Sequence, residues 1–117
     1  MHNFRQLEIW RIGMELTKKI YHFSNKLPNS QRFAVISQMQ RSSASIPSNI
    51  AEGCGRDSKK TFSYFLQIAL GSAFELETQL LLCQDLFSIE EKEVAELIDL
   101  VQKCQKMLIG LKRSLNT

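Results

Sequence analysis

Residues 36–56 constrain the fold of this 117-residue chain most, because their spacing predicts a helix with contact stripes on two opposite sides. One stripe is mainly apolar and consists of Ile36, Met39, Ser43, Ile46 and Ile50. The opposite stripe consists of Arg41, Ser45, Asn49 and Glu52. A helix side that faces water usually carries several Lys and Glu residues, whereas this one is rich in small residues that let another backbone approach. We therefore expect both sides of this helix to be contact surfaces.

Pro47, Gly53 and Gly55 predict how this helix bends and ends. Pro47 lacks a backbone N–H and disfavours helical geometry at the residue before it, so we expect a kink at Pro47. The glycines can adopt left-handed conformations, which would end the helix. Glu52 lies near the negative end of the helix dipole, which costs roughly 0.3–1 kcal/mol without a nearby cation. We expect a structural polar network, rather than a ligand site, in which Glu52 pairs with Arg41 or with Arg56 of a neighbouring copy; its members are Arg41, Ser45, Asn49 and Glu52.

Three further stretches have the apolar spacing of helices. The first runs from about residue 7 to 27, the third from about 58 to 86, and the fourth starts at the capping box Ser88-Ile-Glu-Glu91. No strand-like alternation interrupts them, and the connections are short, which favours antiparallel neighbours. The sequence predicts an all-α protein with a single domain over residues 1–117, folded as an antiparallel up-down four-helix bundle with its second helix kinked at Pro47.

The third helix has more apolar surface than one bundle can bury. Apolar residues such as Tyr64, Phe74 and Leu82 flank its main stripe on both sides. Gly71 costs about 1 kcal/mol of helix stability relative to alanine, which is understandable if a second helix crosses there at close range. We expect this helix to contribute to the core and to an interface between copies. The predicted core or oligomer contacts are Trp10, Ile46, Gly71 and Ser72.

Two segments of the chain resemble one known family. The segments RSSASIPSNIAEGCGR (residues 41–56) and FLQIALGSAFELE (residues 65–77) are similar to the hallmarks of the four-helix-bundle family encoded by intervening sequences in bacterial 23S rRNA genes, the S23 family. The chain departs from the family pattern at residues 31–35 and at Thr61, where the family often has Glu. The resemblance implies a four-helix protomer in a ring-like homo-oligomer, commonly a pentamer, with association to RNA or DNA and no enzymatic activity.

Charge adds a partner hypothesis to this resemblance. The net charge of +3 is modest for one chain, but a ring of five copies would carry five times as much and would attract a polyanion. Arg56, Lys59 and Lys60 lie at the predicted start of the third helix, where free backbone N–H groups also favour phosphate. These side chains could equally serve solubility. The alternative function is an oligomeric scaffold that binds a protein partner such as a polymerase.

The sequence offers little for catalysis or metal binding. Cys54, Cys83 and Cys104 are too far apart for a C-x-x-C signature and odd in number, so we expect buried or loop thiols. The glycine turn leaves open an exposed and reactive Cys54. Glu75 and Glu77 are two apart and do not share a helix face. We expect no catalytic residue, metal or cofactor. Neither a membrane span nor a secretory signal is visible, so we expect a cytoplasmic protein.

Overall fold

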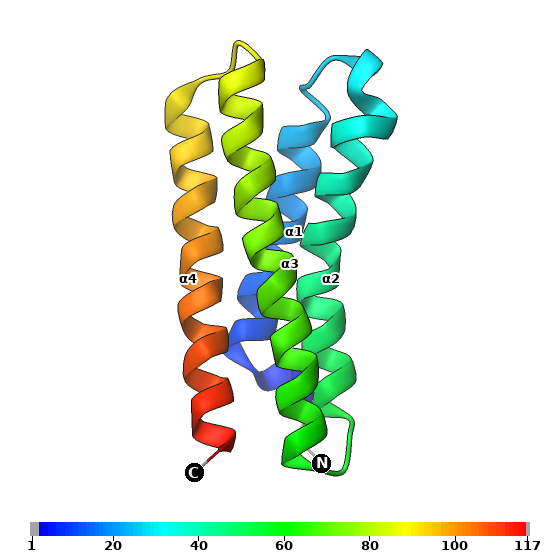
Figure 1. The fold of residues 1–117 in the computed structure, drawn as a ribbon, viewed down its shortest axis with the longest axis vertical. Helices are drawn as coiled ribbons and strands as arrows, with labels where there is room; N and C mark the ends of the chain where they lie inside the picture. The colour runs from blue at the N-terminus through cyan, green and yellow to red at the C-terminus, as the bar shows by residue number, and fades with distance from the viewer. Residues whose placement is uncertain (1–2, 117) are drawn as a thin grey trace.

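The computed structural model describes residues 3–116, apart from the side chain of Arg32. Four α-helices make up most of it: α1 (Glu8–Ser24), α2 (Ser37–Cys54), α3 (Lys59–Leu86) and α4 (Glu91–Leu115). The described residues form no β-strand. Figure 1 shows the helices side by side in one bundle, with each helix running opposite to the one before it. The bundle is elongated, with extents of 45 × 22 × 20 Å.

Short helical turns complete the chain at the ends of the bundle. The 3₁₀ turn η1 (Phe4–Gln6) precedes α1, and Asn3 caps it by accepting a hydrogen bond from the Arg5 backbone N–H at 3.1 Å. The connection between α1 and α2 contains a second 3₁₀ turn, η2 (Asn29–Gln31), and a π-helical turn, η3 (Arg32–Ile36). The first helix therefore ends at Ser24, three residues before the predicted end at residue 27.

The core lies along the bundle axis because each helix buries one stripe of apolar residues. The most completely buried large side chains come from all four helices: Leu16, Ile20, Phe23, Met39, Ile46, Ile50, Leu66, Leu76, Leu80, Val94, Val101 and Leu108. Helix α3 packs extensively on both α2 and α4, whereas α1 and α4 make the fewest contacts of the neighbouring pairs. No helix in the described part of the chain is long and apolar enough to cross a membrane.

Pro47 lies inside α2, which continues through it without interruption. Because proline has no N–H, the carbonyl of Ser43 lacks its usual helical partner. The Thr17 hydroxyl of α1 supplies one: its Oγ1 lies 3.0 Å from the Ser43 carbonyl oxygen and 2.9 Å from that of Gly13. A side chain of the neighbouring helix thus replaces the backbone hydrogen bond that Pro47 cannot make. The kink at Pro47 stays a prediction.

The glycines at the end of α2 act differently from the prediction. No described glycine has a positive φ, and Gly55, the C-cap residue, is right-handed at φ −81°. The left-handed conformations expected at Gly53 and Gly55 are therefore wrong. Gly53 is needed for space instead, because a Cβ built on it would lie 2.6 Å from Cβ of Phe65. The missing side chain lets α2 and α3 approach closely.

The starts of α3 and α4 are capped differently. Ser58 is the N-cap of α3, and its hydroxyl accepts a hydrogen bond from the Thr61 N–H at 3.0 Å. The capping box predicted at Ser88 is wrong, since α4 starts two residues later than that box requires, with Glu90 as N-cap and no side-chain cap bond. The acidic first turn (Glu91, Glu93) and basic last turn (Lys112, Arg113) of α4 suit the helix dipole without a cap.

Candidate functional site

Arg56 is the member of the predicted nucleic-acid site that already has intramolecular partners. Its Nη2 lies 3.5 Å from Oε1 of Glu52, and its guanidinium carbon lies 5.1 Å from the centre of the Phe65 ring. Both ion-pair side chains are about half exposed, at 49% and 52%. The predicted cation beside Glu52 is therefore Arg56 of the same chain. Such an exposed pair leaves much of the positive charge of Arg56 available to solvent.

Lys59 and Lys60 begin α3 and are both exposed. Neither forms an ion pair with any residue in the range 3–116. Figure 1 places the α2–α3 turn, the start of α1 and the end of α4 at the same end of the bundle. Basic residues outnumber acidic ones there: Arg5, Arg56, Lys59, Lys60, Lys112 and Arg113 against Glu8, Glu52 and Asp57. We call this end of the bundle the basic end.

The predicted polar network divides into two separate parts. Ser45 Oγ lies 2.8 Å from Ser72 Oγ of α3, and Asn49 Nδ2 donates to the Ser45 carbonyl at 2.8 Å and lies 2.9 Å from Ser45 Oγ. This trio joins the polar side of α2 to α3. Glu52 belongs to the ion pair with Arg56 and not to the trio. Arg41 is exposed and has no hydrogen bond or ion pair with the described residues. A network that joins all four residues, with a neighbouring copy as a possible contributor, stays a prediction.

The predicted core or oligomer contacts fall into different environments. Ile46 is fully buried, and Trp10 is half-buried with its ring 5.2 Å from that of Phe4. Ser72 contacts α2 through Ser45. Gly71 faces outward: a Cβ built on it would meet nothing within 4 Å. The close helix crossing expected at Gly71 is therefore not made within the protomer.

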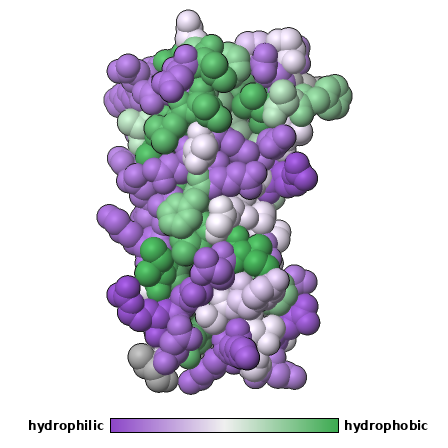
Figure 2. All heavy atoms as spheres, in the orientation of Figure 1, coloured by the Kyte–Doolittle hydropathy of each residue, from purple (hydrophilic) through white to green (hydrophobic). Residues whose placement is uncertain are grey.

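Gly71 lies in the middle of an apolar surface that we call the outward face of α3. It consists of Tyr64, Gly71, Phe74, Leu81, Leu82 and Leu86, and its large side chains are 46–65% exposed. Figure 2 shows apolar atoms along α3 on this side of the molecule, most densely toward the end where α3 meets the connection to α4. Exposed polar residues share this side of α3: Gln67, Glu75, Thr78 and Asp85. Several large apolar side chains exposed on one helix of a single chain are nevertheless typical of an interaction site.

The thiols and carboxylates do not form a reactive set. No disulfide joins Cys54, Cys83 and Cys104, and all three are buried. The exposed, reactive Cys54 considered from the sequence is wrong, because Cys54 is only 1% exposed and burial raises its pKa. Burial also raises the pKa of Cys104, to about 11. No group of three or more His, Cys, Asp or Glu residues in the described part of the chain is placed to hold a metal ion.

Glu77 has a role that its spacing in the sequence did not reveal. Its carboxylate accepts hydrogen bonds from Gln105 at 2.7 Å and from Gln102 at 3.0 Å, which ties α3 to α4. Thr17 and Gly53 were also missed as packing residues. The proline four residues after Ser43 was a usable signal for a donor such as Thr17, whereas nothing local indicated which helix would approach Gly53.

Comparisons with known proteins identify the family. The model of the 23S rRNA-intervening sequence protein family matches residues 5–110. A 1.70 Å crystal structure of a protein of unknown function from the S23 ribosomal protein family of Bacteroides thetaiotaomicron VPI-5482 is similar, with 27% identity and a TM-score of 0.83. The match covers 90% of this chain and 95% of that one. A search of curated proteins gives no match. Because the family model spans most of its length, this chain belongs to the 23S rRNA-intervening sequence protein family.

Proposed function

We propose that this protein is a non-enzymatic module that assembles with copies of itself through the outward face of α3. The observation that carries the proposal is the exposure of large apolar side chains on that face, with Leu86 at 65%, Tyr64 at 62% and Leu82 at 51%. Removing apolar surface from water stabilises association by about 25 cal/mol per Å². Burial of this face against a second chain would therefore contribute favourably to the free energy of association, against the entropy that association costs.

Gly71 is placed to serve the same interface. Gly110 of α4 is equally open, but Gly71 differs from it in lying among the exposed apolar side chains of α3. Glycine is unfavourable inside an exposed helix by about 1 kcal/mol relative to alanine, and no part of the protomer requires it, since the space above it is open. A second helix that crosses at Gly71 would use that space, because a residue without a side chain lets two backbones approach closely. The ring-like assembly, commonly a pentamer, that the family resemblance implies is the form that we propose.

The test compares substitutions at two glycines where an added side chain would meet no other part of the protomer. Gly71→Arg places a long charged side chain on the outward face of α3, whereas Gly110→Arg makes the same change on α4, where a Cβ also meets nothing within 4 Å. We expect light scattering to give an oligomeric mass for the native protein and for Gly110→Arg, and a monomeric mass for Gly71→Arg and Leu82→Glu. A native protein that stays monomeric at high concentration would overturn the proposal, as would oligomers that survive both changes.

We further propose that the assembled particle associates with RNA or DNA through Arg56, Lys59 and Lys60. Two features support this: Lys59 and Lys60 are exposed without an ion pair among the described residues, and the basic end gathers further cations beside them. Each added copy multiplies the charge that a polyanion meets, and phosphate binding releases counterions from the nucleic acid. The interaction should therefore weaken steeply as salt rises.

The nucleic-acid test uses charge reversal with a matched control. Reversal of Arg56, Lys59 and Lys60 to Glu should abolish binding of a labelled single-stranded RNA or DNA in a fluorescence anisotropy titration at low salt. Reversal of Lys18, Lys92 and Lys103 to Glu changes the net charge equally but lies away from the basic end, so it should weaken binding much less. Equal losses in the two variants would contradict a specific site.

The scaffold for a protein partner is the alternative. The ion pair between Arg56 and Glu52, and the carboxylate of Asp57 beside Lys59, reduce the net charge of the predicted site, which favours this alternative. It becomes the better description if the native oligomer binds neither RNA nor DNA at low salt.

A further inference from the structure

A groove lies between α1 and α4, away from the surfaces considered above. Its volume is about 590 Å³, and α3 contributes none of its lining residues. Residues of α1 and α4 form its two walls: Glu15, Lys18, Lys19 and His22 on one side, and Glu93, Glu96, Leu97, Asp99, Leu100 and Lys103 on the other. We call it the α1–α4 groove.

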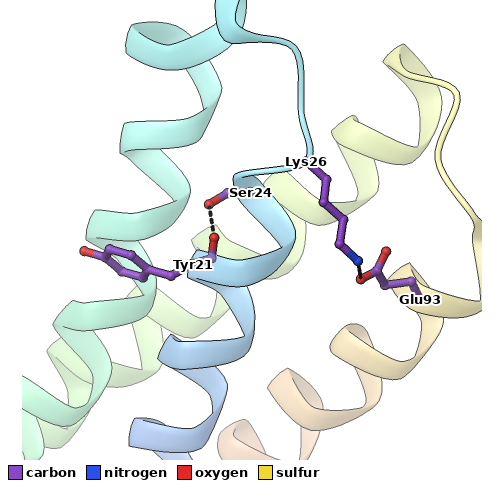
Figure 3. A network of polar contacts seen from close by, with 4 residues as sticks. All are labelled: Tyr21, Ser24, Lys26 and Glu93. Atoms are coloured by element: carbon purple, nitrogen blue, oxygen red, sulfur yellow. Dashed lines mark hydrogen bonds and ion pairs between the residues drawn. The ribbon is translucent and has the colours of Figure 1, made fainter.

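The groove exists because α1 and α4 are the least closely packed neighbours in the bundle. One ion pair connects the two sides of the groove near the C-terminal end of α1. There Lys26 reaches across from the chain after α1, and its Nζ lies 2.7 Å from Oε2 of Glu93 on α4 (Figure 3). Between the other residues of the two walls no ion pair forms within the described chain. The two helices thus face each other across a space that their own side chains do not bridge.

Where one wall of the groove carries basic residues, the other carries mainly acidic ones. Lys18 and Lys19 make the middle of the α1 wall basic, whereas Glu93, Glu96 and Asp99 make most of the α4 wall acidic. Beyond them the signs are exchanged, with Glu15 on α1 and Lys103 on α4. Lys19 pairs only weakly with Glu15 of its own helix, at 3.8 Å between exposed groups. Each wall therefore presents charges without a close partner in the other wall.

Apolar surface lies at the bottom of the groove. Leu97 is buried in the core, and Leu100, one turn of α4 away on the same side, is only half-buried. A ligand in this groove would therefore meet apolar surface in the middle, ammonium groups on one flank and carboxylates on the other.

We propose that the α1–α4 groove binds an amphipathic helix of a partner protein, with an apolar stripe flanked by acidic residues on one side and basic residues on the other. Its acidic flank faces Lys18 and Lys19, and its basic flank faces Glu96 and Asp99. The α4 wall from 93 to 103 is about 15 Å long at 1.5 Å per residue, which matches roughly ten helical residues of a partner.

A helix fits this groove better than an extended peptide does. Both walls are α-helices whose backbone groups are already hydrogen-bonded, so an extended strand would find no edge to pair with. A helix satisfies its own backbone and offers apolar side chains at every third or fourth position, the spacing of a bundle seam. The occupant would lie along α1 and α4 as a fifth helix.

The test uses two designed peptides of identical composition. Both are fluorescein-labelled helices of about fourteen residues with leucine at every third or fourth position; one has Lys on one flank and Glu on the other, and the second has Lys and Glu mixed on both flanks. Because hydrophobicity and net charge are equal, only the segregation of charge differs. We expect fluorescence anisotropy to show at least about tenfold tighter binding of the segregated peptide.

Two variants of α4 locate the binding. Leu100→Glu places a charge in the floor of the groove and should weaken binding of the segregated peptide at least about tenfold. Ile109→Glu makes the same kind of change on the same helix but lies in the hollow between α3 and α4, so it should leave binding unchanged. Circular dichroism checks that both variants are folded.

Three results of the binding titrations would overturn the proposal: no binding of the segregated peptide, equal binding of the two peptides, or full binding by Leu100→Glu. A lower oligomeric mass for Leu100→Glu would also overturn it, since a second copy of this chain would then occupy the groove.

Discussion

Replacing Gly53 by alanine adds one methyl group, which has two opposite effects on the free energy of unfolding. Alanine is favoured over glycine by up to about 1 kcal/mol in a helix, and the gain is smaller at Gly53 because it is the last but one residue of α2. Against this, the new Cβ would lie 2.6 Å from Phe65 Cβ, 3.0 Å from Phe62 Cδ1 and 3.3 Å from the Phe62 carbonyl oxygen. Phe65 Cβ is fixed to its backbone and cannot swing away, so the two helices must move apart.

The size of that movement sets the expected loss. Carbon atoms in normal contact are about 3.5–4.0 Å apart, so α2 and α3 would have to separate locally by about 1 Å. Overpacking of this kind typically costs about 1–3 kcal/mol. After subtraction of the helix gain, we expect the free energy of unfolding to fall by about 1–2 kcal/mol, which corresponds to a melting temperature lower by roughly 4–8 °C.

Gly110→Ala is the matched control. Gly110 lies within α4, and a Cβ there meets nothing within 4 Å, so alanine should raise the free energy of unfolding by up to about 1 kcal/mol. Urea denaturation followed by circular dichroism measures both variants, at one protein concentration because assembly would add to the apparent stability. If Gly53→Ala is stabilised as much as Gly110→Ala, the close approach of α2 and α3 at this point does not exist in solution.

Three further changes test other contacts. Thr17→Val should lower the free energy of unfolding by about 1–3 kcal/mol because the Ser43 carbonyl loses its donor, whereas Thr17→Ser should retain most of the stability in the same urea measurement. Stability should fall as the pH rises above about 9, because the pKa of the Cys104 thiol is raised from 9.0 to about 11 by burial and the unfolded chain loses this proton first. Cys104→Ala should show a shallower decline in the same pH series, and an identical decline would exclude Cys104 as a cause. Lys26→Ala should cost less than about 1 kcal/mol, and high salt should remove most of the difference, because both members of its ion pair with Glu93 are partly exposed.

The sequence was sufficient for the features that depend on spacing along one helix. The four apolar stripes predicted an all-helical protein of four helices. They also placed the start of the third helix at about residue 58, where Ser58 caps it. The resemblance at residues 41–56 and 65–77 led to the family that the comparison identifies.

Features that depend on which helices pack against each other could not be predicted from the sequence. Gly53 and Gly71 are both glycines in helical segments, but the first is pressed against Phe65 and the second faces open space. The part of the predicted network at Arg41 stays a prediction for the same reason, because Arg41 belongs to the right stripe of α2 but forms no ion pair with a carboxylate in the described part of its own chain.

The hydrogen bond from Thr17 to Ser43 makes residues 17 and 47 depend on each other, although they lie on different helices. While proline occupies position 47, residue 17 must donate a hydrogen bond to the carbonyl that proline leaves unpaired. With alanine at position 47 the backbone N–H would return, and valine at position 17 would then cost little. Thr17→Val and Pro47→Ala should therefore be non-additive when combined, and the second change should rescue the first.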